Sequence, residues 1–149
     1  MSGPVIATGV IAAAQGAMAA TRVPASSQLA QWALESAWGA RAPGNNPFGI
    51  QHMAGFGDQR FLSHEVLHGR TVAITETFAV FASIDQAFLV HAHLIATRPV
   101  YAPAMAALPD LGKFVGLMAA HYATDPDYAA KILALIKQHD LTRYDAVKK

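Results

Sequence analysis

The chain has 149 residues, of which 53% are hydrophobic and 14% charged, and its formal net charge is +1. This length predicts one domain, residues 1–149, and the hydrophobic content suffices for a packed core and excludes a disordered chain. The small net charge excludes strong attraction to nucleic acid or to acidic membranes. Because the sequence contains no cysteine, disulfide bonds and thiolate chemistry are also excluded.

The first predicted element is a helix from about Val5 to Thr21, which is uncharged and rich in alanine. Ala17-Met18-Ala19 resembles a signal-peptide cleavage site, but no Lys or Arg precedes the segment. The segment is also short for a membrane span of about 20 residues. We therefore expect a structural first helix without stable membrane insertion. Because no export signal is then present, we expect delivery by another route, such as a phage holin.

The second predicted helix covers residues 25–38, begins after a proline and ends before a glycine, which suit these two positions. Glu35 lies in its last turn, where unpaired backbone carbonyls carry partial negative charge. Trp32 and Trp38 lie three residues on either side of Glu35, which predicts that both share its side of the helix. Carbonyl dipoles and apolar rings both raise the pKa of a carboxyl group, as general acid catalysis near neutral pH requires. The alternative is a solvated surface glutamate.

Residues 40–47 form a predicted loop, and residues 60–81 change to the alternating pattern of β-strands. His68-Gly69 suits a two-residue hairpin turn, because glycine readily adopts a positive φ angle. The register that follows pairs Leu67 with Arg70, Glu65 with Val72, Ser63 with Ile74 and Phe61 with Glu76. Glu65 and Glu76 would then share a face with apolar side chains, about 13 Å apart at roughly 3.3 Å per residue. A substrate cleft would explain these acids, and a charged edge that blocks sheet aggregation is the alternative.

The second half of the chain is predicted to be helical. Ser83 can cap a helix that runs to about Thr97. Within it, His91 and His93 cannot share a helix face, and the sequence contains no His-Glu-x-x-His pattern, so we expect no metal site. The further predicted elements are a short helical piece at 103–107, a helix at 110–122, a last long helix that starts at Asp125-Pro126, and a frayed polar tail at 141–149.

Four segments resemble, in the same order, motifs of the bacterial glucosaminidase family. This family comprises the peptidoglycan N-acetylglucosaminidases of glycoside hydrolase family 73, including the flagellar rod muramidase type. The segments are Ser-Gln-Leu-Ala-Gln-Trp-Ala-Leu-Glu-Ser-Ala-Trp-Gly at 27–39, Asn-Pro-Phe-Gly-Ile-Gln at 46–51, Phe-Ala-Val-Phe-Ala-Ser at 78–83 and Tyr-Ala-Thr-Asp-Pro-Asp-Tyr-Ala at 122–129. The resemblance covers roughly residues 5–139. It implies a single catalytic domain of mostly α (α+β) class, which is a lysozyme-like helical domain with one small β-hairpin lobe.

The resemblance also implies roles for three catalytic residues. Glu35, in the Leu-Glu-Ser motif, would be the general acid that protonates the glycosidic oxygen. Glu65 falls where the family often has a hairpin carboxylate and could activate the attacking water, with Glu76 as the reserve candidate. Alternatively, the 2-acetamido group of the substrate attacks, and a nearby acid only orients it. Tyr122 would border the cleft and position the acetamido group or a water molecule.

Substrate binding is expected from a second set of residues. Asn46, Phe48 and Gln51 would line sugar subsites, since amides can bond acetamido groups and aromatic rings can stack on sugars. Phe48 could equally belong to the core. Trp38, Glu76 and Tyr128 complete the set, although core packing is the favoured alternative for Tyr128.

The expected function is that of a peptidoglycan hydrolase that cleaves the β-1,4 bond after N-acetylglucosamine, as a phage endolysin does. The alternatives are a lytic transglycosylase or muramidase of lysozyme type, and a cell-wall-binding module without catalysis. We expect a monomer that needs no cofactor, binds glycan strands but no nucleic acid, and acts on the cell wall in the periplasm or outside the cell. Without a signal peptide, the protein would stay in the cytoplasm until its release.

Overall fold

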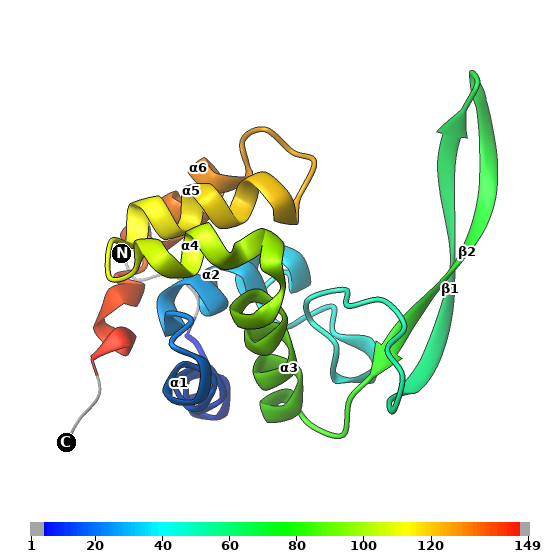
Figure 1. Cartoon of the computed structure of the whole chain (residues 1–149). Helices are drawn as coiled ribbons and strands as arrows, with labels where there is room; N and C mark the ends of the chain where they lie inside the picture. Colours follow the sequence, from blue (N-terminus) through cyan, green and yellow to red (C-terminus); the bar gives the residue numbers. More distant parts are fainter. Residues whose placement is uncertain (1–4, 147–149) are drawn as a thin grey trace.

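The computed structural model describes residues 5–146, apart from the side chains of Ser63 and Glu65, and contains six α-helices and one two-stranded antiparallel sheet in that range (Figure 1). The α-helices are α1 (Thr8–Thr21), α2 (Ala25–Ser36), α3 (Ile84–Thr97), α4 (Ala102–Ala107), α5 (Leu111–Tyr122) and α6 (Tyr128–Gln138). The strands are β1 (Gly57–Leu67) and β2 (Arg70–Val80), and short 3-10 turns occupy Pro43–Asn45, Pro99–Tyr101 and Leu141–Asp145. The predicted mostly helical class with one β-hairpin is confirmed.

Helix α2 lies at the centre of the helical body, with ten of its twelve residues buried. Helix α1 packs against α2 and α3 through Ala13, Ala14 and Ala17, whose small side chains permit a close approach. The first helix is therefore a structural element, as predicted, although it begins at Thr8 instead of Val5. None of the helices within residues 5–146 combines the length and apolarity needed to cross a membrane.

Helix α2 ends two residues earlier than predicted. Ala37 and Trp38 adopt positive φ angles of 50° and 58°, which stop the helix at Ser36. The Ser36 hydroxyl donates to the carbonyl of Trp32 at 2.5 Å and accepts from the backbone N–H of Gly39 at 2.8 Å, so it stabilises this end. Because Trp38 leaves the helix, the prediction that it shares the helix face with Glu35 is wrong.

The β-hairpin has the predicted register in every pair, including Glu65 with Val72 and Phe61 with Glu76. His68 and Gly69 form its turn with positive φ angles of 52° and 76°. Figure 1 shows the hairpin extending away from the helices. In its outer half the described side chains on both faces are exposed, with Val66 on one face and Val72 on the other 73% and 38% exposed.

The C-terminal segment was predicted to fray, and this is wrong for the described residues up to Ala146. Leu141 is fully buried. The Asp145 carboxylate accepts hydrogen bonds from the backbone N–H and the hydroxyl of Ser26, at 2.7 and 2.6 Å. Since Ser26 lies in the first turn of α2, Asp145 satisfies an N–H group that has no partner within the helix. The last helix likewise starts at Tyr128 and not at Asp125.

Candidate active site

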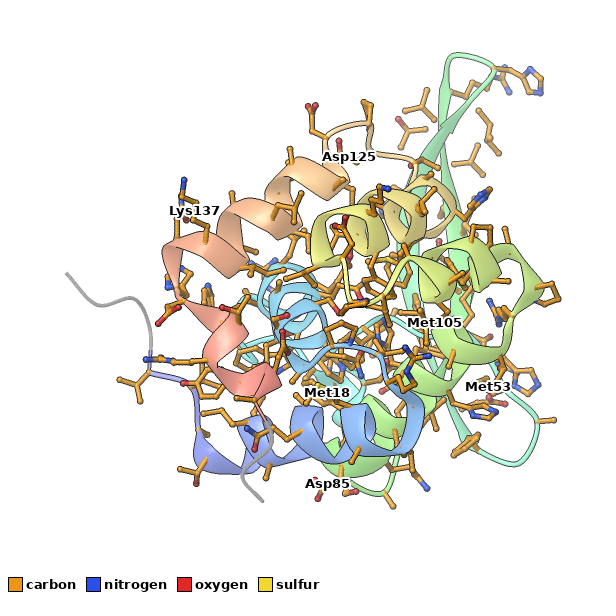
Figure 2. The ribbon with its side chains drawn as sticks, turned by 60° about the vertical axis from the view of Figure 1, so that its left-hand side comes forward. Met18, Met53, Asp85, Met105, Asp125 and Lys137 are labelled. Atoms are coloured by element: carbon orange, nitrogen blue, oxygen red, sulfur yellow. The ribbon has the colours of Figure 1, made fainter. Side chains whose placement is uncertain are left out.

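A cleft of about 630 Å³ opens beside the C-terminal end of α2. Its walls come from the loop at residues 48–53, from α3 with the turn that follows it, and from the end of α5 with residues 123–124. Met53, labelled in Figure 2, belongs to the loop wall. Among the lining residues are Glu35, Phe48, Gln51, His91, Arg98 and Tyr122.

Glu35 is the one carboxylic acid among the described residues that line this cleft. The Glu35 side chain is accessible to solvent, because one side of it faces the open cleft. Partial burial nevertheless raises the pKa of its carboxyl above the usual value, and a hydrogen bond from Tyr128 partly offsets this rise. The direction agrees with the prediction. A group of this kind retains its proton to higher pH than an ordinary glutamate, which suits it to act as an acid.

Tyr128 connects Glu35 to the buried interior. Its hydroxyl donates to Oε1 of Glu35 at 3.0 Å and accepts from Nε2 of Gln31 at 3.1 Å. Burial raises the pKa of Tyr128, so its hydroxyl keeps its hydrogen and remains a donor. The carboxyl of Glu35 is therefore held in position through one of its two oxygens.

A second polar chain lies behind Tyr122. The Tyr122 hydroxyl lies 2.9 Å from Nε2 of His91, and Nδ1 of His91 contacts Oε1 of Gln28. The His91 ring stacks on Phe48 with a centroid distance of 3.9 Å, and Tyr122 stacks on Tyr128 at 5.6 Å. These contacts join the loop wall, α3 and the α5–α6 side of the cleft to α2.

The structure brings four of the predicted site residues to the cleft wall: Glu35, Phe48, Gln51 and Tyr122. Phe48 also belongs to the core, since only 4% of it is exposed. Tyr128 is buried behind the wall and touches Glu35.

Asn46, Trp38 and Glu76 are not among the described residues that line the cleft. The Asn46 amide donates to the carbonyls of Ile50 and Ala79 and accepts from the N–H of Ile50, so these bonds shape the loop. Trp38 packs edge-on against Trp32 and His139 instead. Its place follows from the early end of α2.

The structure describes the two hairpin acids, Glu65 and Glu76, to different extents. Glu76 lies on β2 opposite Phe61 and is partly exposed. Glu65 has a defined backbone position opposite Val72, but its side chain lies outside the described part of the structure.

Gln28, Gln31 and His91 were not predicted as site residues. A signal for the glutamines exists, because positions 28, 31 and 35 are spaced by three and four residues and therefore share one face of α2. Polar amides on a helix whose residues are mostly buried need partners, and Tyr128 and His91 supply them. Arg98 is the one Lys or Arg among the described residues that line the cleft, and no pattern in the sequence pointed to it. Within residues 5–146, no cluster of three His, Asp or Glu side chains suitable for a metal occurs.

Comparison with known proteins identifies relatives of this domain. The Glucosaminidase family model, described as mannosyl-glycoprotein endo-beta-N-acetylglucosaminidase, matches residues 11–141. The probable N-acetylmuramidase of Lactococcus lactis subsp. cremoris (strain MG1363) is 35% identical over 130 residues, which are 80% of this chain and 30% of that protein. The exo-glucosaminidase LytG of Bacillus subtilis is 32% identical over 127 residues, with 80% of this chain and 45% of that protein covered. The chain thus spans less than half the length of these relatives.

Solved structures share the fold over nearly the whole chain. The catalytic domain of the autolysin Auto from Listeria monocytogenes superimposes with a TM-score of 0.81 at 25% identity, covering 97% of this chain and 90% of that one. A glycoside hydrolase domain of FlgJ from Salmonella typhimurium gives a TM-score of 0.73 at 29% identity, covering 88% and 93%. The lysozyme-like fold expected from the sequence is therefore shown.

Proposed function

The chain belongs to the glucosaminidase family, and on that premise we propose that it hydrolyses the β-1,4 glycosidic bond after N-acetylglucosamine in peptidoglycan. The observation that carries this proposal is Glu35, a cleft carboxyl with a raised pKa that Tyr128 holds in position. The relatives support the substrate class, since FlgJ of Salmonella typhimurium bears the name peptidoglycan hydrolase.

In this proposal, Glu35 is the general acid. Because the Tyr128 hydroxyl occupies Oε1, the transferable proton resides on Oε2. Glu35 gives this proton to the glycosidic oxygen as the bond to the sugar breaks, and it leaves that step as a carboxylate. The hydrogen bond from Tyr128 then stabilises the new negative charge.

The group that attacks the sugar carbon has two candidates. Glu65 could remove a proton from a water molecule on the opposite face of the sugar, which requires a separation of about 6.5–9.5 Å from Glu35 and an approach of the hairpin to the cleft. Alternatively, the 2-acetamido oxygen of the substrate attacks, and Tyr122 positions this group. In both cases Gln51 and Phe48 are proposed to contact the sugars, and Glu76 is held in reserve.

The names of the relatives favour a second candidate function, because the Lactococcus lactis proteins are named as N-acetylmuramidases. Digestion of purified peptidoglycan, followed by reduction and mass spectrometry of the new chain ends, distinguishes the two. We expect reduced N-acetylglucosamine at the new ends. Reduced N-acetylmuramic acid at the new ends would identify a muramidase, and anhydro sugar ends would identify a lytic transglycosylase. Glycan that is bound but not cleaved would identify a binding module without catalysis.

We also propose that the domain works as a monomer on the bacterial cell wall without a cofactor. The support is that one chain supplies every protein group assigned above, from α2, α5, α6, the loop at residues 48–53 and the hairpin.

A further inference from the structure

A continuous chain of hydrogen bonds runs from the protein backbone to the cleft surface. Gln28 Nε2 donates to the carbonyl of Phe88 at 2.9 Å, Gln28 Oε1 meets Nδ1 of His91, and His91 Nε2 lies 2.9 Å from the Tyr122 hydroxyl. Gln28 and His91 are 0% and 2% exposed, and Tyr122 and one side of the His91 ring line the cleft. With solvent excluded, the direction of each bond follows from the bond before it.

The backbone carbonyl of Phe88 can only accept a hydrogen bond, so the Gln28 amide must turn Nε2 toward Phe88 and Oε1 toward His91. An amide oxygen also only accepts, and Nδ1 of His91 must therefore carry a hydrogen. Burial lowers the pKa of His91 to about 3, so the ring is neutral at neutral pH and its Nε2 has no hydrogen. It follows that the Tyr122 hydroxyl donates its hydrogen to His91.

We propose that Gln28 and His91 are positioning residues that make the Tyr122 hydroxyl a hydrogen-bond acceptor, and never a donor, toward the group bound in the cleft. That group must then present an N–H or an O–H to Tyr122. This part rests on the proposed function, in which the 2-acetamido N–H of the sugar and the attacking water are the two available donors. A carbonyl or carboxylate oxygen of the substrate cannot form a hydrogen bond with the Tyr122 hydroxyl, because neither group donates a hydrogen.

The contrast with Tyr128 supports the assignment. The two stacked tyrosines have opposite hydrogen-bond directions, because Tyr128 receives a hydrogen from Gln31 and donates toward the cleft acid Glu35. Tyr122 sends its hydrogen inward instead. Gln31 therefore orients Tyr128 as a hydrogen-bond donor to Glu35. Gln28, three residues earlier on α2, acts through His91 and leaves Tyr122 as a hydrogen-bond acceptor for the substrate.

The hydrogen positions can be tested without any substrate. Two-bond proton–nitrogen NMR correlations of the histidine ring distinguish Nδ1–H from Nε2–H. We expect His91 in the wild-type protein to be neutral and in the Nδ1–H form at pH 7. An Nε2–H ring would make Tyr122 accept from His91 and would overturn the proposal, as would a doubly protonated ring.

The role of Gln28 is tested by Gln28→Met, which keeps the side-chain length but removes the strong acceptor for Nδ1. The ring is then free to move its hydrogen to Nε2, and a mixture of both forms should appear. Gln31→Met is the matched control, because Gln31 is equally buried but bonds Tyr128, so it should leave the His91 ring in the Nδ1–H form. An unchanged ring in Gln28→Met would exclude Gln28 from this role, and the wild-type spectrum alone still tests the proposal if the variant does not fold.

Kinetics test the substrate side. Gln28→Met should lower kcat/KM for peptidoglycan about tenfold, as the loss of one hydrogen bond does. It should cause no further loss in a Tyr122→Phe background, because no hydroxyl remains to be oriented. A rise in KM would assign the donor to the acetamido group, and a fall in kcat alone would assign it to the water. An additive loss in the double variant would overturn the proposal.

Failure of the proposed function would be visible separately. If the wild-type protein cleaves no glycan, the function is wrong, while the ring spectra still decide the direction of the hydrogen bonds. If it cleaves glycan but His91 carries its hydrogen on Nε2, only the present inference fails.

Discussion

The Tyr128 hydroxyl donates a hydrogen bond to Oε1 of Glu35 at 3.0 Å and thereby ties the first residue of α6 to the last turn of α2. Two opposing influences act on the same carboxyl. Burial raises its pKa, and the hydrogen bond from Tyr128, which favours the charged form, lowers it. Tyr128 thus limits how far the pKa of the acid rises, and it holds the resulting carboxylate after proton transfer.

Tyr128→Phe should move the pH dependence of hydrolysis. Without the hydroxyl, the carboxylate of Glu35 is less stable and its pKa rises further. A general acid works in its protonated form, so activity is lost as the pH rises through this pKa, and in the variant this loss should occur at higher pH. The measurement is kcat/KM against pH, with Tyr144→Phe, away from the cleft lining, as the control. A descending limb that stays in place or moves to lower pH would contradict the assignment.

Glu35→Gln should lower the rate of peptidoglycan hydrolysis at least about 10²-fold, the low end for general acid–base catalysis. The fold should be retained, because the amide has the same size and its oxygen can still accept from Tyr128. Circular dichroism checks the fold, and release of soluble glycan fragments gives the rate. If the purified variant hydrolysed cell walls at the wild-type rate, Glu35 would not be the general acid.

Glu65→Gln separates the two candidate attacking groups. If Glu65 activates water, the variant should lose about as much rate as Glu35→Gln, and the first-formed sugar anomer should be inverted. If the acetamido group attacks, the loss should be much smaller and the anomer retained. NMR of the initial product gives the anomer.

Glu76→Gln is the control for that experiment, because Glu76 sits four ribbon positions from the Glu65 pair in the hairpin register. It should reduce activity only mildly in either case. Retention of the anomer together with nearly normal Glu65→Gln activity would exclude Glu65 from the mechanism, and a severe loss in Glu76→Gln would reverse the order of the two acids.

Asp145→Ala should destabilise the domain by about 1–2 kcal/mol, the usual cost of removing a helix cap. The carboxylate of Asp145 receives two hydrogen bonds from Ser26 at the start of α2. Urea unfolding measures the difference. Asp127→Ala is the matched control, since Asp127 precedes α6 without a side-chain cap bond, and a surface change of this kind should stay within about 0.5 kcal/mol. Equal midpoints for both variants would contradict the capping role.

Local chemistry allowed much of the fold to be predicted from the sequence. The turn at His68-Gly69 and the period of two along the strands determined the hairpin register, because both act between residues that are close in the chain. Ser83 was recognised as a helix cap for the same reason, and its hydroxyl accepts from the N–H of Gln86 at 3.1 Å. The family motif around Glu35 identified the candidate acid and with it the enzyme class.

The end of α2 could not be predicted in this way. Apolar spacing continued to Trp38, but positive φ angles at Ala37 and Trp38 end the helix at Ser36. Trp38 instead packs against His139, which follows α6 far along the chain. A spacing rule applies only while the helix continues, so it placed Trp38 on the wrong side of Glu35.

The sequence by itself determined the elements, their order, the hairpin pairing and the candidate acid. Only the tertiary structure decided which side chains surround that acid: Tyr128 reaches Glu35 from 93 positions away, and His91 meets Gln28 across 63. Hydrogen bonds of this kind depend on how the helices pack, and packing joins residues whose separation along the chain leaves no periodic trace. The direction of each bond, and hence the chemistry of the cleft wall, follows from that packing.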